Sequence, residues 1–170
     1  TVGIYNFYGK ANPTGKYRIK INYLEEGTNK VLAKSFVSDL IKNNLSLKYK
    51  YEDILVLFKN EEELKKGKLH FINSKIPCRR VKNSLDSNGD KVKLAAFNDV
   101  LGISSKVTIV TNFNNENYCT NKDKKILLDE IAIAENELYL IGYGRESKLI
   151  NNLPLGVLED KRFISNRGIE

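Results

Sequence analysis

The chain has 170 residues, of which 41% are hydrophobic and 29% are charged, which is typical of one soluble globular domain with a real core. Its formal net charge of +7 is compatible with a polyanionic partner, although a lysine-rich composition alone does not specify one. No apolar run approaches the roughly eighteen residues of a membrane span. The sequence therefore predicts a cytoplasmic protein with a single domain (1–170) and no membrane partner.

The residue types that most often carry chemistry follow no recognisable pattern. Cys78 and Cys119 have neither metal-binding nor redox spacing, which favours two unpaired thiols in a reducing cytosol. His70 is the only histidine, and no carboxylate or cysteine pattern surrounds it, so we interpret it as a surface or packing residue. The sequence also contains no methionine, so we expect either that an initiator methionine before Thr1 was removed or that the chain is a domain cut from a longer protein. These residues predict no metal site and no nucleophilic catalytic group.

The first third of the chain predicts two strands and a helix. Residues 1–15 form an irregular lead-in, because glycines and a proline interrupt the apolar residues. Alternating apolar residues over 16–23 predict a half-buried strand at a sheet edge. Thr28 is the expected N-cap of a helix that ends near Asn43. The continuous apolar run over 53–58 is typical of a strand buried on both faces.

The rest of the chain alternates helices and strands. We expect a charged helix over 61–69, an edge strand over 76–81 and a turn over 83–90. A strand over 92–97, a loop with Gly102 and a strand over 107–110 follow. The last expected elements are a helix that Thr120 and Asp123 cap, a strand over 138–141 and a less regular tail over 150–170. This alternation predicts an α/β fold with a mostly parallel sheet of five or six strands and helices on both faces. Ligands of such sheets bind where strands end, so the loop after Phe97 is the first candidate site.

One cluster of basic residues lies at the end of the strand predicted over 76–81. Arg79, Arg80 and Lys82 lie together, with Lys75 nearby. These side chains could contact phosphates, or they could form an ordinary solvated face. The sequence leaves both interpretations open.

Several segments resemble a known family when they are taken together. Residues 53–59 are similar to the strand pattern D-I-A-V-L-x-R, and residues 115–118 to a segment E-E-N-Y. Residues 96–104 occupy the place of T-x-H-x-x-K-G-L-E, and residues 126–134 that of L-L-Y-V-A-x-T-R-A, before a strand L-Y-L. In the order and spacing of these segments, and in the positions of their hydrophobic residues, the chain resembles the C-terminal RecA-like domain of superfamily 1 helicases of the UvrD-like group, especially its HelD-like branch.

The resemblance implies roles for individual residues. Lys59 occupies the place of an arginine that reaches the nucleotide γ-phosphate, and Gly102 and Ser104 lie on the nucleotide side. Ala96 and Asn98 lie on the nucleic-acid side, where Asn98 replaces a histidine that approaches the nucleic-acid backbone. Lysine can supply the charge of the arginine but not its planar two-pronged contact.

The motif residues depart from the family pattern at several positions. Leu101 and Ser104 replace the lysine and glutamate of the K-G-L-E segment, and Ala132 and Ile133 replace the threonine and arginine of T-R-A. The sequence also lacks a G-x-x-x-x-G-K-[ST] phosphate loop. Alone, the chain should therefore neither bind ATP tightly nor cleave it, and needs no cofactor.

The resemblance also implies partners. An active parent would contain an N-terminal RecA-like domain with the phosphate loop, use ATP and Mg²⁺, and act on single-stranded DNA. The resemblance to HelD implies RNA polymerase as a further partner, although no individual residue of the chain supports this partner.

Three functions stay open from the sequence. The first is the C-terminal domain of a UvrD/HelD-like ATP-dependent DNA helicase, in which the weak motifs are misaligned. The second is a degenerate, non-catalytic helicase-like scaffold that binds nucleic acid or protein, since hydrophobic burial alone can preserve the fold. The third is an unrelated α/β domain, such as an interaction module or a small nuclease, for which Glu52 and Asp53 are candidate acids.

Overall fold

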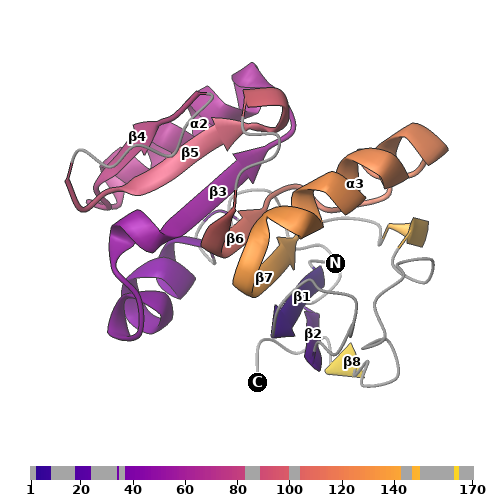
Figure 1. Cartoon of the computed structure of the whole chain (residues 1–170), viewed down its shortest axis with the longest axis horizontal. Coiled ribbons are helices and arrows are strands. Elements are labelled where there is room, and N and C mark those ends of the chain that lie inside the picture. The colour runs from indigo at the N-terminus through magenta and orange to yellow at the C-terminus, as the bar shows by residue number, and fades with distance from the viewer. Residues whose placement is uncertain are drawn as a thin grey trace.

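A computed structural model describes residues 34, 37–82, 89–99, 104–142 and 147–149, apart from the side chain of Asn98 (Figure 1). It also describes the backbone of three further strands, β1 (Gly3–Tyr8), β2 (Arg18–Tyr23) and β8 (Phe163–Ile164). Within this part of the chain, the strands form one eight-stranded sheet in the order β4-β5-β3-β6-β7-β1-β2-β8.

Five neighbouring strands of this sheet are parallel. They are β3 (Ile54–Phe58), β4 (Cys78–Arg80), β5 (Val92–Ala96), β6 (Ser105–Val110) and β7 (Ala134–Ile141). β1 then pairs antiparallel with both β7 and β2, and β2 pairs parallel with β8. The predicted α/β fold with a mostly parallel sheet is confirmed, but the expected number of five or six strands is wrong, because β1, β2 and β8 extend the sheet to eight strands.

Two α-helices connect the parallel strands, and both begin at the residues that cap them. α2 (Glu61–Asn73) follows Asn60, whose side chain accepts a hydrogen bond from the backbone N–H of Glu63. α3 (Asn121–Ile133) follows Thr120 in a capping box with Asp123, as predicted. Shorter turns are η1 (Leu40–Asn44), η2 (Leu45–Leu47), η3 (Tyr51–Asp53) and η4 (Phe97–Asp99). None of the helices in the described ranges is long and apolar enough to cross a membrane.

The core lies on both faces of the sheet, because all five residues of β3 are buried. Leu55 and Leu57 belong to a cluster that α3 covers with Leu127 and Ile131. The alternate residues of β3 belong to a second cluster, to which α2 contributes Leu64 and Phe71. A strand buried on both faces needs apolar residues at every position, which explains the unbroken run that predicted it. The expected helices on both faces are therefore present.

Three predictions about strands near the ends of the sheet have different outcomes. β4 lies at one edge of the sheet as expected, where Pro77 costs no ladder hydrogen bond. The irregular lead-in predicted over 1–15 is wrong in part, because β1 falls within it and pairs with two strands. The strand predicted over 16–23 is β2, but β8 pairs with it and takes the edge position. Both differences arise from pairing between distant segments. Thr28 and residues 83–88 lie outside the described residues.

Candidate functional site

Polar side chains gather at the edge of the sheet where the parallel strands end. Lys59 directly follows β3, Arg80 is the last residue of β4, and Asp99 lies in η4, just after β5. Because β3, β4 and β5 are parallel, their carboxyl ends meet at the same edge. We call this side of the sheet the carboxyl edge. Ligands of open α/β sheets bind on this side.

Lys59 joins the end of β3 to the start of α3. Its Nζ donates hydrogen bonds to the carbonyl oxygen of Asn117 at 2.7 Å and to Oδ1 of Asp123 at 3.1 Å. The same ammonium group lies 4.5 Å from the centre of the Tyr118 ring. The Lys59 side chain is only 23% exposed. Its charge is therefore already balanced by a carboxylate, a carbonyl oxygen and an aromatic ring.

Asp123 accepts hydrogen bonds both from Lys59 and from backbone N–H groups just before α3. Its Oδ2 accepts hydrogen bonds from the backbone N–H groups of Cys119 and Thr120, each at 3.0 Å. Partial burial by itself would raise the pKa of Asp123. The two N–H groups and the Lys59 ammonium outweigh this effect and hold the pKa well below its usual range. The carboxylate is therefore charged at neutral pH.

Replacement of Asp123 by alanine is expected to lower the free energy of unfolding at pH 7 by about 1–3 kcal/mol, because it removes a cap and leaves Lys59 without its carboxylate partner. Because the folded pKa is depressed, this contribution is present above the unfolded pKa of about 4 and is lost as the pH falls further. Urea unfolding at pH 7 measures the effect. Lys122→Ala, an exposed change in the same helical turn, is the control, and equal losses in both variants would contradict the assignment.

Arg80 makes a second connection along the carboxyl edge. Its Nη1 donates to Oε1 of Glu61, at the start of α2, and its Nη2 donates to Oδ2 of Asp99 at 2.9 Å. Arg80 thus ties the end of β4 to segments that follow β3 and β5. Since both terminal nitrogens already bond carboxylates, a phosphate would have to displace one of them.

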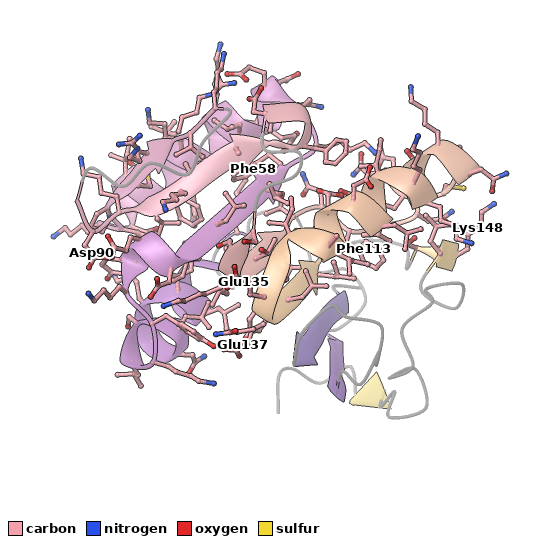
Figure 2. All side chains as sticks on the ribbon, viewed as in Figure 1. Phe58, Asp90, Phe113, Glu135, Glu137 and Lys148 are labelled. Atoms are coloured by element: carbon pink, nitrogen blue, oxygen red, sulfur yellow. The ribbon has the colours of Figure 1, made fainter. Side chains whose placement is uncertain are left out.

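A small cavity of about 40 Å³ lies beside this edge, between α2 and the sheet. Its apolar walls include Phe58, which Figure 2 labels at the end of β3, and Ile141. Its polar groups include Glu63, Asn112 and His70. A volume of this size holds about three water molecules or one small aliphatic group.

His70 acts as a packing residue, in agreement with the sequence. Its Nε2 lies 2.7 Å from Oγ of Ser38, which is buried. Burial, together with the charge of Lys34, lowers the pKa of the ring, so His70 is neutral at pH 7. The two cysteines are free, as expected.

A carboxyl group that the sequence analysis missed lies beneath α3. Glu130 is completely buried, and the hydroxyl of Tyr118 donates to its Oε1 at 2.8 Å. Burial raises the pKa of Glu130 to about 7, although the Tyr118 hydrogen bond and the charge of Lys59 act in the opposite direction. The sequence did contain a signal. Glu130 lies three residues after Leu127 and one before Ile131, on the buried stripe of the helix.

The structure separates the site residues that the helicase resemblance implies. Ala96 ends β5 and Asn98 lies in η4, so both lie at the carboxyl edge with Lys59. Ser104 directly precedes β6 at the opposite, amino edge, where the hydroxyl of Ser105 donates to the carbonyl oxygen of Asp53 at 3.1 Å. The physical reason is that residues 97–104 connect the end of one parallel strand to the beginning of another. Gly102 and Leu101 lie outside the described residues.

The position of the missing arginine is also far from Lys59. Ile133 is the last residue of α3, is buried, and directly precedes β7 at the amino edge. The structure therefore does not bring Lys59 together with either Ser104 or Ile133. The implied roles of Lys59, Gly102, Ser104, Ala96 and Asn98 stay predictions.

Asp53, one of the two acids that would support a nuclease, occupies a structural position. Asp53 accepts a hydrogen bond from the backbone N–H of Lys50 at 3.1 Å, and it lies 3.8 Å from the Lys106 ammonium. In the described part of the chain, no group of three or more histidine, cysteine or acidic side chains could hold a metal ion.

No family model matches the chain, and no curated protein matches it in sequence. A solved structure shares its fold. That structure is the C-terminal domain of a possible DNA helicase from Lactobacillus plantarum WCFS1, with a TM-score of 0.68 and 17% sequence identity. The superposition covers 86% of this chain and 84% of the other. The predicted α/β fold therefore matches that of a solved structure over most of the chain.

Proposed function

We propose that this chain is the C-terminal RecA-like domain of a helicase of the UvrD/HelD-like group, acting with an N-terminal RecA-like domain that carries the phosphate loop. The shared fold with the C-terminal domain of a possible DNA helicase, over 86% of the chain, carries the proposal. The motif segments support it, because residues 53–59 contain β3 with one residue on each side, and residues 126–140 contain the second half of α3 and most of β7. ATP and Mg²⁺ would belong to the parent and single-stranded DNA would be its substrate.

In a helicase motor, the second domain contributes cations that stabilise charge on the transferred phosphoryl group. In this chain Lys59 is the candidate for that task, because it occupies the place of the family's arginine after β3 and lies at the carboxyl edge. A phosphate would have to compete with Asp123 for the Lys59 ammonium, 3.1 Å away. Binding of nucleotide by the parent would then loosen the connection between β3 and α3.

A second candidate function is a non-catalytic scaffold that binds nucleic acid or protein, with RNA polymerase among the partners to test. Two observations favour it. Ile133, in the place of the motif arginine, is buried and uncharged. The cations Lys59 and Arg80 at the carboxyl edge both bond carboxylates of the domain itself.

ATP turnover by the full-length parent, with and without an oligo-dT single strand, separates the two candidates. A motor is expected to bind ATP and to hydrolyse it faster with DNA, and Lys59→Ala should lower that rate at least about tenfold. Lys125→Ala, an exposed change on α3, should leave the rate unchanged. A parent that retains DNA affinity but binds no ATP would instead be a scaffold. A parent that binds neither ATP nor the oligonucleotide would contradict the helicase proposal.

A further inference from the structure

One side of α2 carries a stripe of two apolar and two basic residues, of which all but Lys68, which is partly buried, are exposed. Leu69 is 60% exposed and Ile72 is 55% exposed, so two large aliphatic side chains three residues apart on the helix face solvent. Lys65 and Lys68 precede them with the spacing i, i+3, i+4 and i+7, which places all four residues on one side of the helix. We call Lys65, Lys68, Leu69 and Ile72 the α2 stripe.

The α2 stripe lies beside β4, the edge strand. Glu61, one helical turn before Lys65, bonds Arg80 of β4. The charge of Lys68 acts on the thiol of Cys78, and the Cys78 side chain packs against the core cluster to which α2 contributes. Figure 1 shows α2 running alongside β4 and β5. The stripe and the edge strand therefore form one continuous surface.

The outer side of β4 offers backbone groups for another strand. The carbonyl oxygen of Pro77 accepts a hydrogen bond from the N–H of Val92, and the N–H of Val81 donates to Leu94, so these residues face β5. Because backbone groups of alternate residues point the same way, the N–H and C=O groups of Cys78 and Arg80 face outward. Among the described strands, none pairs with this outer side.

The charge around this surface is positive. Besides the two lysines of the stripe, this surface includes four more cations. Lys75, Arg79 and Lys82 lie in or next to β4 in the sequence, and the charge of Lys91 acts on the thiol of Cys78. Within the described ranges none of these six side chains forms an ion pair with a carboxylate. Two acids lie nearby: Glu61 bonds Arg80, and Asp90, next to Lys91, accepts a hydrogen bond from the backbone N–H of Glu52 and offsets only one of the six cations. The surface thus has an excess of unbalanced cations.

We propose that the α2 stripe and the outer side of β4 bind an extended, acidic segment of a partner protein, which pairs with β4 as an added strand. Only an extended peptide can use the outward backbone groups of Cys78 and Arg80 while its alternate side chains reach Leu69 and Ile72. Its acidic residues would match the surrounding lysines. A nucleic acid would satisfy the cations but would use neither the strand edge nor the apolar pair.

The probe is a peptide of about twelve residues in which glutamate alternates with valine, titrated into the ¹⁵N-labelled 170-residue chain. The expected result is a set of chemical-shift changes centred on residues 65–72 and 78–80. A peptide with lysine in place of glutamate should bind at least about tenfold more weakly. An oligo-dT strand should not displace the acidic peptide.

Matched variants test each part of the surface. Cys78→Pro removes one outward N–H group without removing a hydrogen bond to β5 and should weaken binding at least about tenfold, whereas Cys78→Ser should bind as the wild type does. Leu69→Ser with Ile72→Ser, and Lys65→Glu with Lys68→Glu, should each weaken binding about tenfold or more. Lys122→Glu with Lys125→Glu on α3 makes the same change in net charge and should have little effect.

Three results would overturn the proposal. These are no binding at millimolar peptide, shift changes that fall elsewhere on the chain, or displacement of the peptide by oligo-dT, which would indicate a general polyanion surface. Circular dichroism of each variant identifies loss of folding. If Cys78→Pro does not fold, the two double variants still decide the outcome, because none of their four positions is buried in the core.

Discussion

Glu130→Gln is expected to raise the free energy of unfolding by roughly 2–3 kcal/mol at pH 8 while leaving it nearly unchanged at pH 5. The pKa of this buried carboxyl group rises from 4.5 to about 7 on folding. Between these two values the folded chain holds a proton that the unfolded chain releases, so stability falls as the pH rises through this range and levels off above pH 7. Each tenfold change in proton affinity is worth about 1.4 kcal/mol, which sets the size of the penalty.

Glutamine keeps an oxygen that can accept the hydrogen bond from Tyr118 but has no proton to lose. Urea unfolding at several pH values between 5 and 8 measures the effect, and the variant should show a flatter stability profile than the wild type. Glu116→Gln, the same change at an exposed carboxyl group that does not act on Glu130, is the control and should leave the slope unaltered. If both variants retained the slope of the wild type, Glu130 would not be the titrating group.

Gly142→Ala is expected to destabilise the chain by about 3 kcal/mol, which lowers Tm by roughly 6–12 °C. A Cβ atom at this position would lie 1.9 Å from the carbonyl oxygen of Phe113 and 2.5 Å from its carbonyl carbon. Both are backbone atoms, which no side-chain rotation can move away. The N–H of Phe113 donates to the carbonyl oxygen of Ile141 at 2.9 Å, so the clash would separate the segment after β6 from the end of β7. Phe113, labelled in Figure 2, would lose its packing with Tyr118 as well.

Gly67→Ala is the matched comparison for this prediction. A Cβ atom there would lie 2.3 Å from Cε1 of Phe58, which is also too close, but the obstacle is the ring of a side chain. That ring borders the cavity of about 40 Å³ and can shift toward it, and alanine favours the helix by about 1 kcal/mol over glycine. The loss should therefore be clearly smaller, about 1 kcal/mol. Thermal unfolding of both variants measures the difference, and equal losses would show that backbone contact is not the deciding factor.

Much of the parallel sheet could be predicted because its signals are local. The unbroken apolar run over 53–58 predicted β3, the Thr120–Asp123 spacing predicted the start of α3, and Pro77 predicted the edge position of β4. Each signal depends on a few neighbouring residues, whose burial or capping requirement is visible in the sequence.

The arrangement of the candidate site could not be predicted in the same way. The sequence grouped Lys59 with Ser104 by resemblance, but the direction of the strands puts them at opposite edges of the sheet. It also did not show that Lys59 pairs with Asp123, 64 residues later in the chain. Such partners depend on which strands become neighbours.

The sequence by itself thus determined the class of the fold, the course of the parallel strands and the cap of α3, because hydrophobic periodicity and capping act over a few residues. Only the tertiary structure decided that β1 and β2 extend the sheet, that Lys59 and Arg80 are neutralised by carboxylates, and that Glu130 is buried against Tyr118. These features depend on contacts between distant segments. Their energies come from burial and charge pairing, which arise only once the sheet has formed.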